Sequence, residues 1–322
     1  MTVCIAAISG GTCVYGASDR MITSWVIEFE PEQNQSTSEN KSPPAIKALP
    51  LTNSIVAMIA GQDMSLQSQL IYDLQFILTE RIRKDPANWW TVSDVANRYK
   101  DLYSFRRNQL AEQQILIPRG LSYESFISRQ HEMNPQFLAE VHAKIANFHL
   151  PDLSVIFAGV DPSGPHLYVA RNGNVSCEDL VGFAAIGSGY WHAESHFMAN
   201  GHTKDTPLST GVYLTYAAKR HAEIAPGVGK DTDMFAIGPS LGSYGPISPS
   251  VMQEFKKIYE KAQVNAKRTW QREKGAIQKL LDKLVQASEE RAKAQKEQTP
   301  IEGEATRQPD PTPPAKAAEP GT

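Results

Sequence analysis

The chain has 322 residues, enough for one large domain or two modest ones with a sizeable core. Its formal net charge is −3 and no run of Lys and Arg occurs, which argues against a nucleic-acid-binding protein. No apolar stretch reaches the length of a transmembrane span, and no charged segment followed by an apolar one marks a signal peptide. The three cysteines, Cys4, Cys13 and Cys177, are too few for a disulfide framework. We therefore expect a soluble, cytoplasmic protein.

The first residues predict a β-hairpin. Two apolar or β-branched runs, 3–8 and 12–17, flank the turn signal Ser9-Gly10-Gly11. Such a hairpin brings Thr2 and Asp19 to the same edge of a sheet. If the initiator methionine is removed, Thr2 combines a hydroxyl nucleophile with its own α-amine as the base. That amine titrates at roughly 7.7–8.0, and a nearby lysine would hold it neutral and able to accept a proton.

Three helices are predicted after a buried strand that ends at Gly61. The first has Ser65 as its N-cap, the second begins at Thr91 with Asp94 as its capping partner, and the third begins at Asn134-Pro135. Their apolar residues repeat at helical spacing, which is typical of core faces rather than cofactor sites. The segment between the second and third helices is of mixed character.

Short strands and two helices follow. The strands are predicted over 153–160, 166–170, 183–186 and 233–238, and the helices near 190–200 and 208–222. Periodicity alone indicates a mixed α and β protein.

Three regions of the chain have a different composition from this core. Residues 28–44 are polar and predict a surface loop, or a lid over a cleft. We expect the folded domain to span 1–240 and a helical extension, interrupted by Gly275, to span 250–295. A disordered tail is expected over 296–322, which holds six of the 21 prolines. We expect the part of the extension before Gly275 to pack on the domain through Phe255, Tyr259 and Trp270.

A series of short motifs resembles, in order and spacing, one known family. The motifs are Thr2, the Gly-Gly hairpin, Ala17-Ser18-Asp19-Arg20, Met21-Ile22-Thr23, Lys47, Met58-Ile59-Ala60-Gly61, Val160-Asp161, Pro165-His166-Leu167-Tyr168 and Ala185-Ile186-Gly187-Ser188-Gly189. They resemble the proteasome β-type subunits and their bacterial relatives such as HslV, which are N-terminal-nucleophile (Ntn) hydrolases. The resemblance covers about residues 2–238. It implies an α+β fold, the four-layer α-β-β-α sandwich of the Ntn hydrolases.

The resemblance also implies a catalytic site. It assigns Thr2 as the nucleophile, Asp19 and Lys47 as the pair that tunes its amine, and Ser188 as a hydrogen-bond partner of that amine. The family's usual Asp-x-x-Ser pair after the late helix is missing, and Glu223 or Asp231 are the candidate substitutes. No cofactor and no metal are implied.

Substrate contacts are implied as well. Gly61 would offer its backbone N–H to the oxyanion, and Thr23 would pair its backbone with an extended peptide. Ile59 and Asp63 fall where family members line the pocket for the residue before the cut.

Several of these residues have alternative interpretations. Thr2 is also compatible with an ordinary strand-end threonine behind a retained methionine. Asp19 and Lys47 are also compatible with a structural salt bridge. His192 and His196 share one helix face, but no third metal ligand is evident, so a solvated face is the simpler interpretation. Cys4 would be a nucleophile only if three residues were removed.

The sequence therefore favours a threonine peptidase that acts by acyl transfer within a self-assembled, proteasome-like homo-oligomer, either a ring or a helical assembly. Its substrates would be peptides or unfolded proteins, and an ATPase unfoldase is a candidate partner. Two alternatives stay open. One is a catalytically silent scaffold subunit that recruits a partner through its C-terminal extension, and the other is a small-molecule amidase of the same superfamily.

Overall fold

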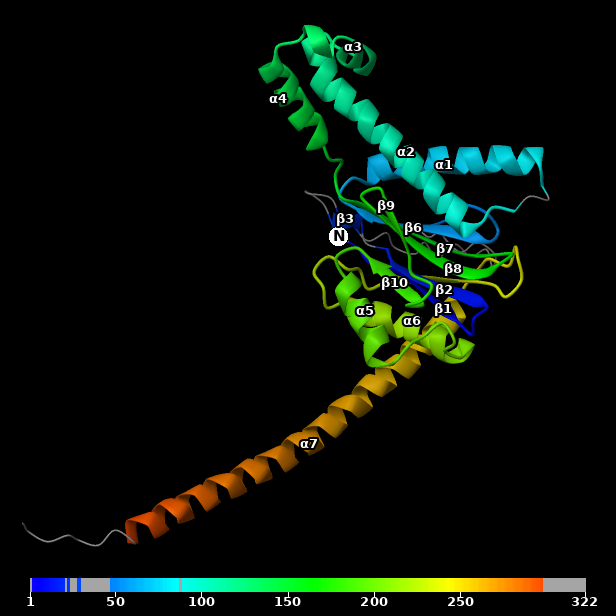
Figure 1. The fold of residues 1–322 in the computed structure, drawn as a ribbon. Coiled ribbons are helices and arrows are strands. Elements are labelled where there is room, and N and C mark those ends of the chain that lie inside the picture. Colours follow the sequence, from blue (N-terminus) through cyan, green and yellow to red (C-terminus); the bar gives the residue numbers. More distant parts are fainter. Residues whose placement is uncertain (1, 21, 24–27, 30–46, 87–88, 298–322) are drawn as a thin grey trace, which may run out of the picture. The chain divides into compact units, whose positions relative to one another are not determined.

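The chain forms a mixed α+β structure with two antiparallel five-stranded sheets (Figure 1). The computed structural model describes residues 2–20, 22–23, 28–29, 47–86 and 89–297, with side chains over 2–20, 47–86 and 89–294. Within these residues there are seven α-helices. None of them is long and apolar enough to cross a membrane.

The first sheet is built on the N-terminal hairpin. Its strand order is β10-β1-β2-β11-β12, with β10 (Phe183–Ile186), β1 (Cys4–Ser9), β2 (Cys13–Asp19), β11 (Thr232–Ile237) and β12 (Gly245–Pro246). In the hairpin Cys4 lies opposite Ser18, and Thr232 of β11 lies opposite Asp19. Gly10 and Gly11 both have positive φ, which explains why the turn needs glycines.

The second sheet is a meander that begins at Ala48. Its order is β5-β6-β7-β8-β9, with β5 (Ala48–Pro50), β6 (Ile55–Gly61), β7 (Leu153–Asp161), β8 (Gly164–Arg171) and β9 (Asn174–Cys177). Asn172 and Gly173 both have positive φ in the turn between β8 and β9, as the Asn-Gly signal predicts. A separate two-stranded ladder pairs β3 (Ile22–Thr23) with β4 (Glu28–Phe29).

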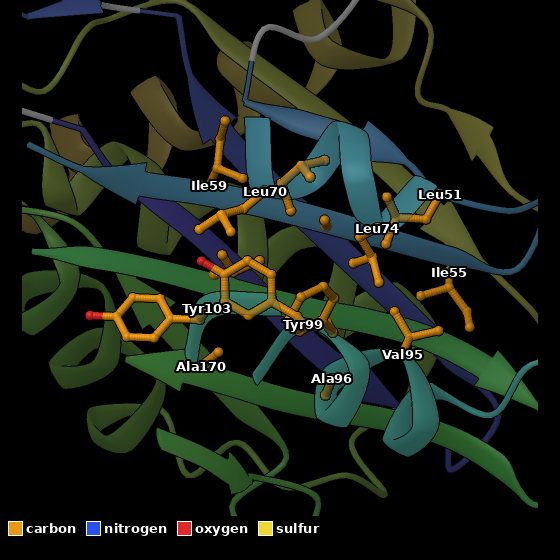
Figure 2. Close-up of a cluster of buried hydrophobic side chains, with 14 of the residues drawn as sticks. Leu51, Ile55, Ile59, Leu70, Leu74, Val95, Ala96, Tyr99, Tyr103 and Ala170 are labelled. Carbon is orange, nitrogen blue, oxygen red and sulfur yellow. The ribbon is translucent and has the colours of Figure 1, made fainter. Parts of the chain in front are cut away.

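Helices α1 (Met64–Lys84) and α2 (Val92–Ala111) cover one face of the second sheet. Figure 2 shows Leu70 and Leu74 of α1 and Val95, Ala96 and Tyr99 of α2 over strand residues such as Ile55. The N-cap of α1 is Asp63, whose carboxylate accepts the Leu66 N–H at 2.9 Å. The prediction of Ser65 as this cap was wrong, because the helix begins one residue before it.

Helices α5 (Tyr190–Ala199) and α6 (Leu208–Ala222) cover the outer face of the first sheet. Every second residue of β1 packs on them, and the alternate residues pack against the second sheet in a separate core that includes Val56 and Ile156. The order helices, sheet, sheet, helices follows from these cores and is seen in Figure 1. This order is compatible with the expected sandwich.

The segment of mixed character between the second and third predicted helices is a small helical lobe. It contains a π-helical turn (Glu112–Leu116), 3-10 turns (Ile117–Arg119 and Gln130–Glu132), α3 (Tyr123–Ser128) and α4 (Pro135–Ala146). Phe126 and Val141 pack there on Leu116 in a core of their own. The N-caps Thr91 of α2 and Asn134 of α4 are confirmed.

The last helix, α7, runs from Pro249–Glu297 and does not break at Gly275. Its first turns belong to the compact unit that ends at Tyr259, where Phe255 and Tyr259 pack against Tyr216 of α6. The remainder belongs to a second unit, in which Trp270 is 56% exposed. The predicted loop over 28–44 begins with the strand β4 at 28–29, and its residues 30–44 lie outside the described residues. The predicted disordered tail over 296–322 begins too early, because α7 includes residues 296 and 297, and the tail from 298 lies outside the described residues.

Candidate active site

The hairpin brings Thr2 and Asp19 into direct contact. Asp19 donates its backbone N–H to the Val3 carbonyl at 3.2 Å, and the Val3 N–H donates to Asp19 Oδ1 at 2.8 Å. The same carboxylate oxygen accepts the Thr2 hydroxyl at 2.7 Å. Thr2 is 6% exposed and Asp19 is 1% exposed. The predicted meeting of nucleophile and carboxylate is therefore present at the end of the hairpin.

Lys47 reaches this carboxylate from the second sheet. Its backbone carbonyl accepts the Ile59 N–H at 2.9 Å, which fixes it beside β6. Its Nζ donates to Asp19 Oδ1 at 2.9 Å, and the two side chains are 2% and 0% exposed. Burying such a pair has a large desolvation cost unless further hydrogen bonds satisfy the carboxylate.

These further bonds come from both sides of Asp19. Thr2 and Val3 donate to Oδ1, and the Gly229 N–H donates to Oδ2 at 3.0 Å. Asp19 is thus an acceptor for a hydroxyl, two backbone amides and an ammonium group. The arrangement holds the hydroxyl of Thr2 beside a lysine cation in a water-poor environment.

Ser188 approaches Thr2 from the turn after β10. Its hydroxyl donates to the Thr2 carbonyl at 3.3 Å, and the Gly189 N–H points to the same oxygen at 3.4 Å. Gly187 has φ of +88°, and a Cβ there would lie 2.2 Å from the Thr2 carbonyl oxygen. A glycine is needed because the turn passes against the backbone of Thr2. Ser188 therefore contacts the carbonyl of Thr2, whereas the expected partner was the amine.

Gly61 lies at the end of β6, opposite Leu153. A Cβ at Gly61 would lie 2.5 Å from the Asp152 carbonyl oxygen, so no side chain fits. Two residues earlier, the Ile59 carbonyl accepts the Cys4 thiol at 3.4 Å. Gly61 is thus placed about 7 Å along the strand from the point where β6 meets β1.

The other predicted substrate contacts are placed as follows. Ile59 is 2% exposed and packs in the core under α1 and α2. Asp63 uses its carboxylate to cap α1. Thr23 pairs with Glu28 in the short ladder, and its side chain lies outside the described residues.

Cys4 is buried under the site and is not activated. Burial raises the pKa of its thiol to about 12, although Lys47 acts in the opposite direction. A thiol needs its thiolate form to act as a nucleophile. The structure therefore gives no support to the thiol alternative.

The sequence reasoning missed Lys219, a fully buried cation on α6. Its Nζ donates to Glu223 Oε1 at 2.7 Å and to the carbonyls of Gly229 and Lys230 at 2.8 and 2.9 Å. Burial lowers the pKa of Lys219, and Glu223 partly offsets that shift. Because Gly229 donates to Asp19, Lys219 fixes the loop that holds the carboxylate. Glu223 was a candidate substitute for the aspartate of the family's missing Asp-x-x-Ser pair. Its carboxylate contacts Lys219, and this lysine links it to the loop that holds Asp19.

A Ser-His-Asp arrangement occurs elsewhere, at the turn between β7 and β8. Ser163 Oγ lies 2.8 Å from His166 Nε2, and His166 Nδ1 lies 2.6 Å from Asp179 Oδ2. Ser163 Oγ also lies 2.6 Å from Asp161 Oδ1. Burial raises the pKa of Asp161, but hydrogen bonds from Ser163 and Val92 outweigh that effect and the pKa is lowered.

The hydrogen count shows why this second arrangement is not a nucleophile and base. The ionised Asp161 can only accept, so it takes the single hydroxyl hydrogen of Ser163. Ser163 then has no hydrogen left to give to His166, so these contacts act as a clasp for the turn and do not pair a nucleophile with its base.

The two histidines of α5, His192 and His196, have no third metal ligand beside them among the described residues. His196 faces His221 of α6 with ring centroids 5.3 Å apart, and burial lowers the pKa of His196. Both His192 and His196 are half-buried, so the expected solvated face is only partly solvated. Over the part of the chain that the structure describes, no group of three or more His, Cys, Asp or Glu could hold a metal ion.

A scan against protein-family models found no match to this sequence, and neither did a search of curated proteins.

Proposed function

We propose that this chain is an N-terminal-nucleophile threonine peptidase of the proteasome β-like kind, with Thr2 as its nucleophile after removal of Met1. The observation that carries the proposal is the buried cluster in which Asp19 Oδ1 accepts both the Thr2 hydroxyl, at 2.7 Å, and Lys47 Nζ, at 2.9 Å. The three residues come from two sheets and 45 positions of chain. A salt bridge that served only the fold would not require a threonine hydroxyl on the same oxygen.

The chemistry that fits these groups is acyl transfer. The free amine of Thr2 takes the proton of its own hydroxyl, and Oγ1 attacks the carbonyl carbon of the substrate amide. The amine must be neutral for this step, and a lysine cation beside it disfavours its charged form. Asp19 holds Lys47 in place through the bond from Nζ to Oδ1.

The remaining steps complete the turnover. The Gly61 N–H holds the oxyanion, the amine returns its proton to the departing nitrogen, and the acyl group stays on Oγ1 as an ester. Water activated by the same amine then hydrolyses the ester and restores Thr2. The Ile59 N–H donates to the Lys47 carbonyl, and the N–H of Gly61, two residues further along the same strand, points to the same edge of β6, which supports this role.

The proposal includes the fold and the assembly. The order of helices and sheets supports the Ntn hydrolase sandwich, with the mouth of the site where the hairpin and β6 meet. The resemblance to proteasome β-type subunits supports a homo-oligomer acting on peptide or unfolded protein substrates, and a small-molecule amidase is the alternative substrate class.

The test is peptide hydrolysis by matched threonine variants of the full chain. Thr2→Ala should lower kcat/KM on the order of 10³-fold or more, because nucleophile and amine act as a unit. Thr2→Ser should retain measurable turnover. Thr12→Ala is the control, since Thr12 lies exposed in the turn of the same hairpin. Full activity in Thr2→Ala would refute the proposal. If the protein hydrolysed small amides but not peptides, the amidase would be favoured.

A further inference from the structure

The second compact unit contains a helical segment that leaves a line of apolar side chains in solvent. We call residues 260–294 of α7 the arm, and every residue in it is exposed. Five of its large apolar members are Trp270 56%, Ile277 49%, Leu280 58%, Leu281 49% and Leu284 60% exposed, while Val264 and Val285, 48% and 55% exposed, lie to one side of these five. An amphipathic helix of this kind is stable mainly when its apolar face packs on a partner.

These five apolar residues share one face of the helix. At about 100° per residue, positions 270, 277, 280, 281 and 284 fall within a stripe roughly 100° wide. Two charged residues lie on the same stripe and bracket its apolar centre, Ile277 to Leu284. Glu273 stands on the N-terminal side and Arg291 on the C-terminal side, eighteen residues apart. That spacing is five helical turns, so both side chains point the same way, about 27 Å apart along the axis.

The separation prevents Glu273 and Arg291 of one arm from pairing with each other. Among the described residues neither forms an ion pair. A charge in the middle of an apolar face disfavours packing unless the opposing surface carries the opposite charge. The arm thus requires a partner surface with a cation, an apolar patch and an anion, in that order and spacing.

We propose that this partner surface is the arm of a second copy of the chain, packed antiparallel. In this arrangement the two arms run in opposite directions and residue 282 of one lies beside residue 282 of the other. Glu273 then lies opposite the partner's Arg291, and Arg291 lies opposite the partner's Glu273. The same register places Leu280 opposite the partner's Leu284 and Ile277 opposite the partner's Ala287. The apolar centre is then enclosed between two symmetric ion pairs, as a twofold contact requires.

The charges also decide the orientation. A parallel pair would set Glu273 against the partner's Glu273 and Arg291 against the partner's Arg291. Like charges within a packed stripe oppose association, so only the antiparallel pair satisfies both residues. The interaction goes beyond the proposed peptidase activity and does not depend on it.

Charge-swap variants of the full-length chain test the pairing. Glu273→Arg and Arg291→Glu should each weaken arm pairing on the order of 30-fold, because each turns two attractions into two repulsions. The double variant Glu273→Arg/Arg291→Glu should restore it, because opposite charges again face each other. Arg272→Glu and Glu289→Arg are the controls, since both lie off the stripe, about 130° from its centre. Single variants without effect, or a double variant that stays weak, would overturn the proposal.

Pulsed electron–electron double resonance measures the distance between spin labels on two copies, and this distance distinguishes the antiparallel from the parallel arrangement of the arms. A spin label at Lys267→Cys, in a chain with the exposed Cys177 replaced by Ser, should report a distance between copies of roughly 45 Å for the antiparallel pair. A distance near 10–15 Å would show a parallel pair and contradict the proposal, as would the absence of a distance between copies. Peptide hydrolysis should be unchanged in Glu273→Arg, so loss of pairing and loss of catalysis are separately observed.

Discussion

Replacing Lys219 by Met should impair catalysis without any change in the residues that touch Thr2. The substitution keeps the length of the side chain but removes the three hydrogen bonds that hold Glu223 and the carbonyls of Gly229 and Lys230. Lys219 is 0% exposed, so loss of this buried network should lower the free energy of unfolding by about 3–5 kcal/mol. The loop that presents Gly229 would then be free to shift.

The catalytic effect follows from the bond between Gly229 and Asp19. A hydrogen bond to a charged group contributes about 1.5–3 kcal/mol, which corresponds to about a 10- to 150-fold loss in kcat/KM. The loss should fall on kcat, with KM nearly unchanged, because Asp19 supports Thr2 and Lys47 and does not bind the peptide. A purely structural defect would lower the amount of protein that reacts with a peptide electrophile and leave kcat per reactive site unchanged.

The matched control is Arg220→Met on the same helix. Arg220 pairs with Glu223 at 3.1 Å and donates to the Lys230 carbonyl at 3.4 Å, but its side chain is 21% exposed and, among the described residues, no hydrogen bond joins it to Gly229. Urea unfolding and kcat/KM should be measured for both variants at a temperature where both are folded. An unchanged kcat per reactive site in Lys219→Met, or equal losses in the two variants, would refute the role of Lys219 in positioning Asp19.

Three further outcomes follow from the site and its surroundings. Lys47→Ala should lower the free energy of unfolding by about 3–5 kcal/mol and nearly abolish hydrolysis, because it leaves the Asp19 carboxylate buried without its cation. A urea unfolding curve and a rate of hydrolysis equal to those of the wild type would contradict this. Gly187→Ala should destabilise the fold and block the site, because its Cβ would meet the Thr2 carbonyl, whereas Gly245→Ala, with nothing within 4 Å, should be nearly neutral by thermal unfolding. Because the pKa of His196 is lowered in the folded chain, the unfolded chain binds more protons than the folded chain as the pH falls below the usual value of 6.5. The free energy of unfolding should therefore decrease there. Urea unfolding at pH 5 and pH 7 should show a smaller difference for His196→Gln than for the wild type.

The fold was largely predictable because most of its signals are local. The Gly-Gly turn, the Asn-Gly turn and the capping residue Asn134 each act within a few residues, and the structure has them where the pattern indicates. The prediction of Ser65 as the N-cap of α1 fails because the Leu66 N–H donates to the carboxylate of Asp63.

The site was predictable only in part. Thr2 and Asp19 meet through the register of one hairpin, which can be read from the sequence. Lys47 belongs to another sheet and was found by resemblance. The support of Asp19 by Gly229 could not be predicted, because a backbone amide carries no sequence signal and the two residues are 210 positions apart. Lys219 did leave a signal, since it is a lysine on an otherwise apolar helix face.

The structure of the arm was also only partly predictable from the sequence. Gly275 indicated a break, yet α7 continues through it, since one glycine costs about 1 kcal/mol against many favourable residues. The stripe of apolar residues was visible, but the shared face of Glu273 and Arg291 emerges only when the helix is known to be continuous.

The most direct test of the central claim is intact mass spectrometry of the active protein before and after reaction with a peptide electrophile. We expect the mass to lack Met1 and, after labelling, to increase by one adduct that maps to the N-terminal peptide at Thr2. The adduct should form in Thr12→Ala and should be absent in Thr2→Ala. A fully active preparation that retains Met1, or an adduct on Cys4 in place of Thr2, would contradict the mechanism.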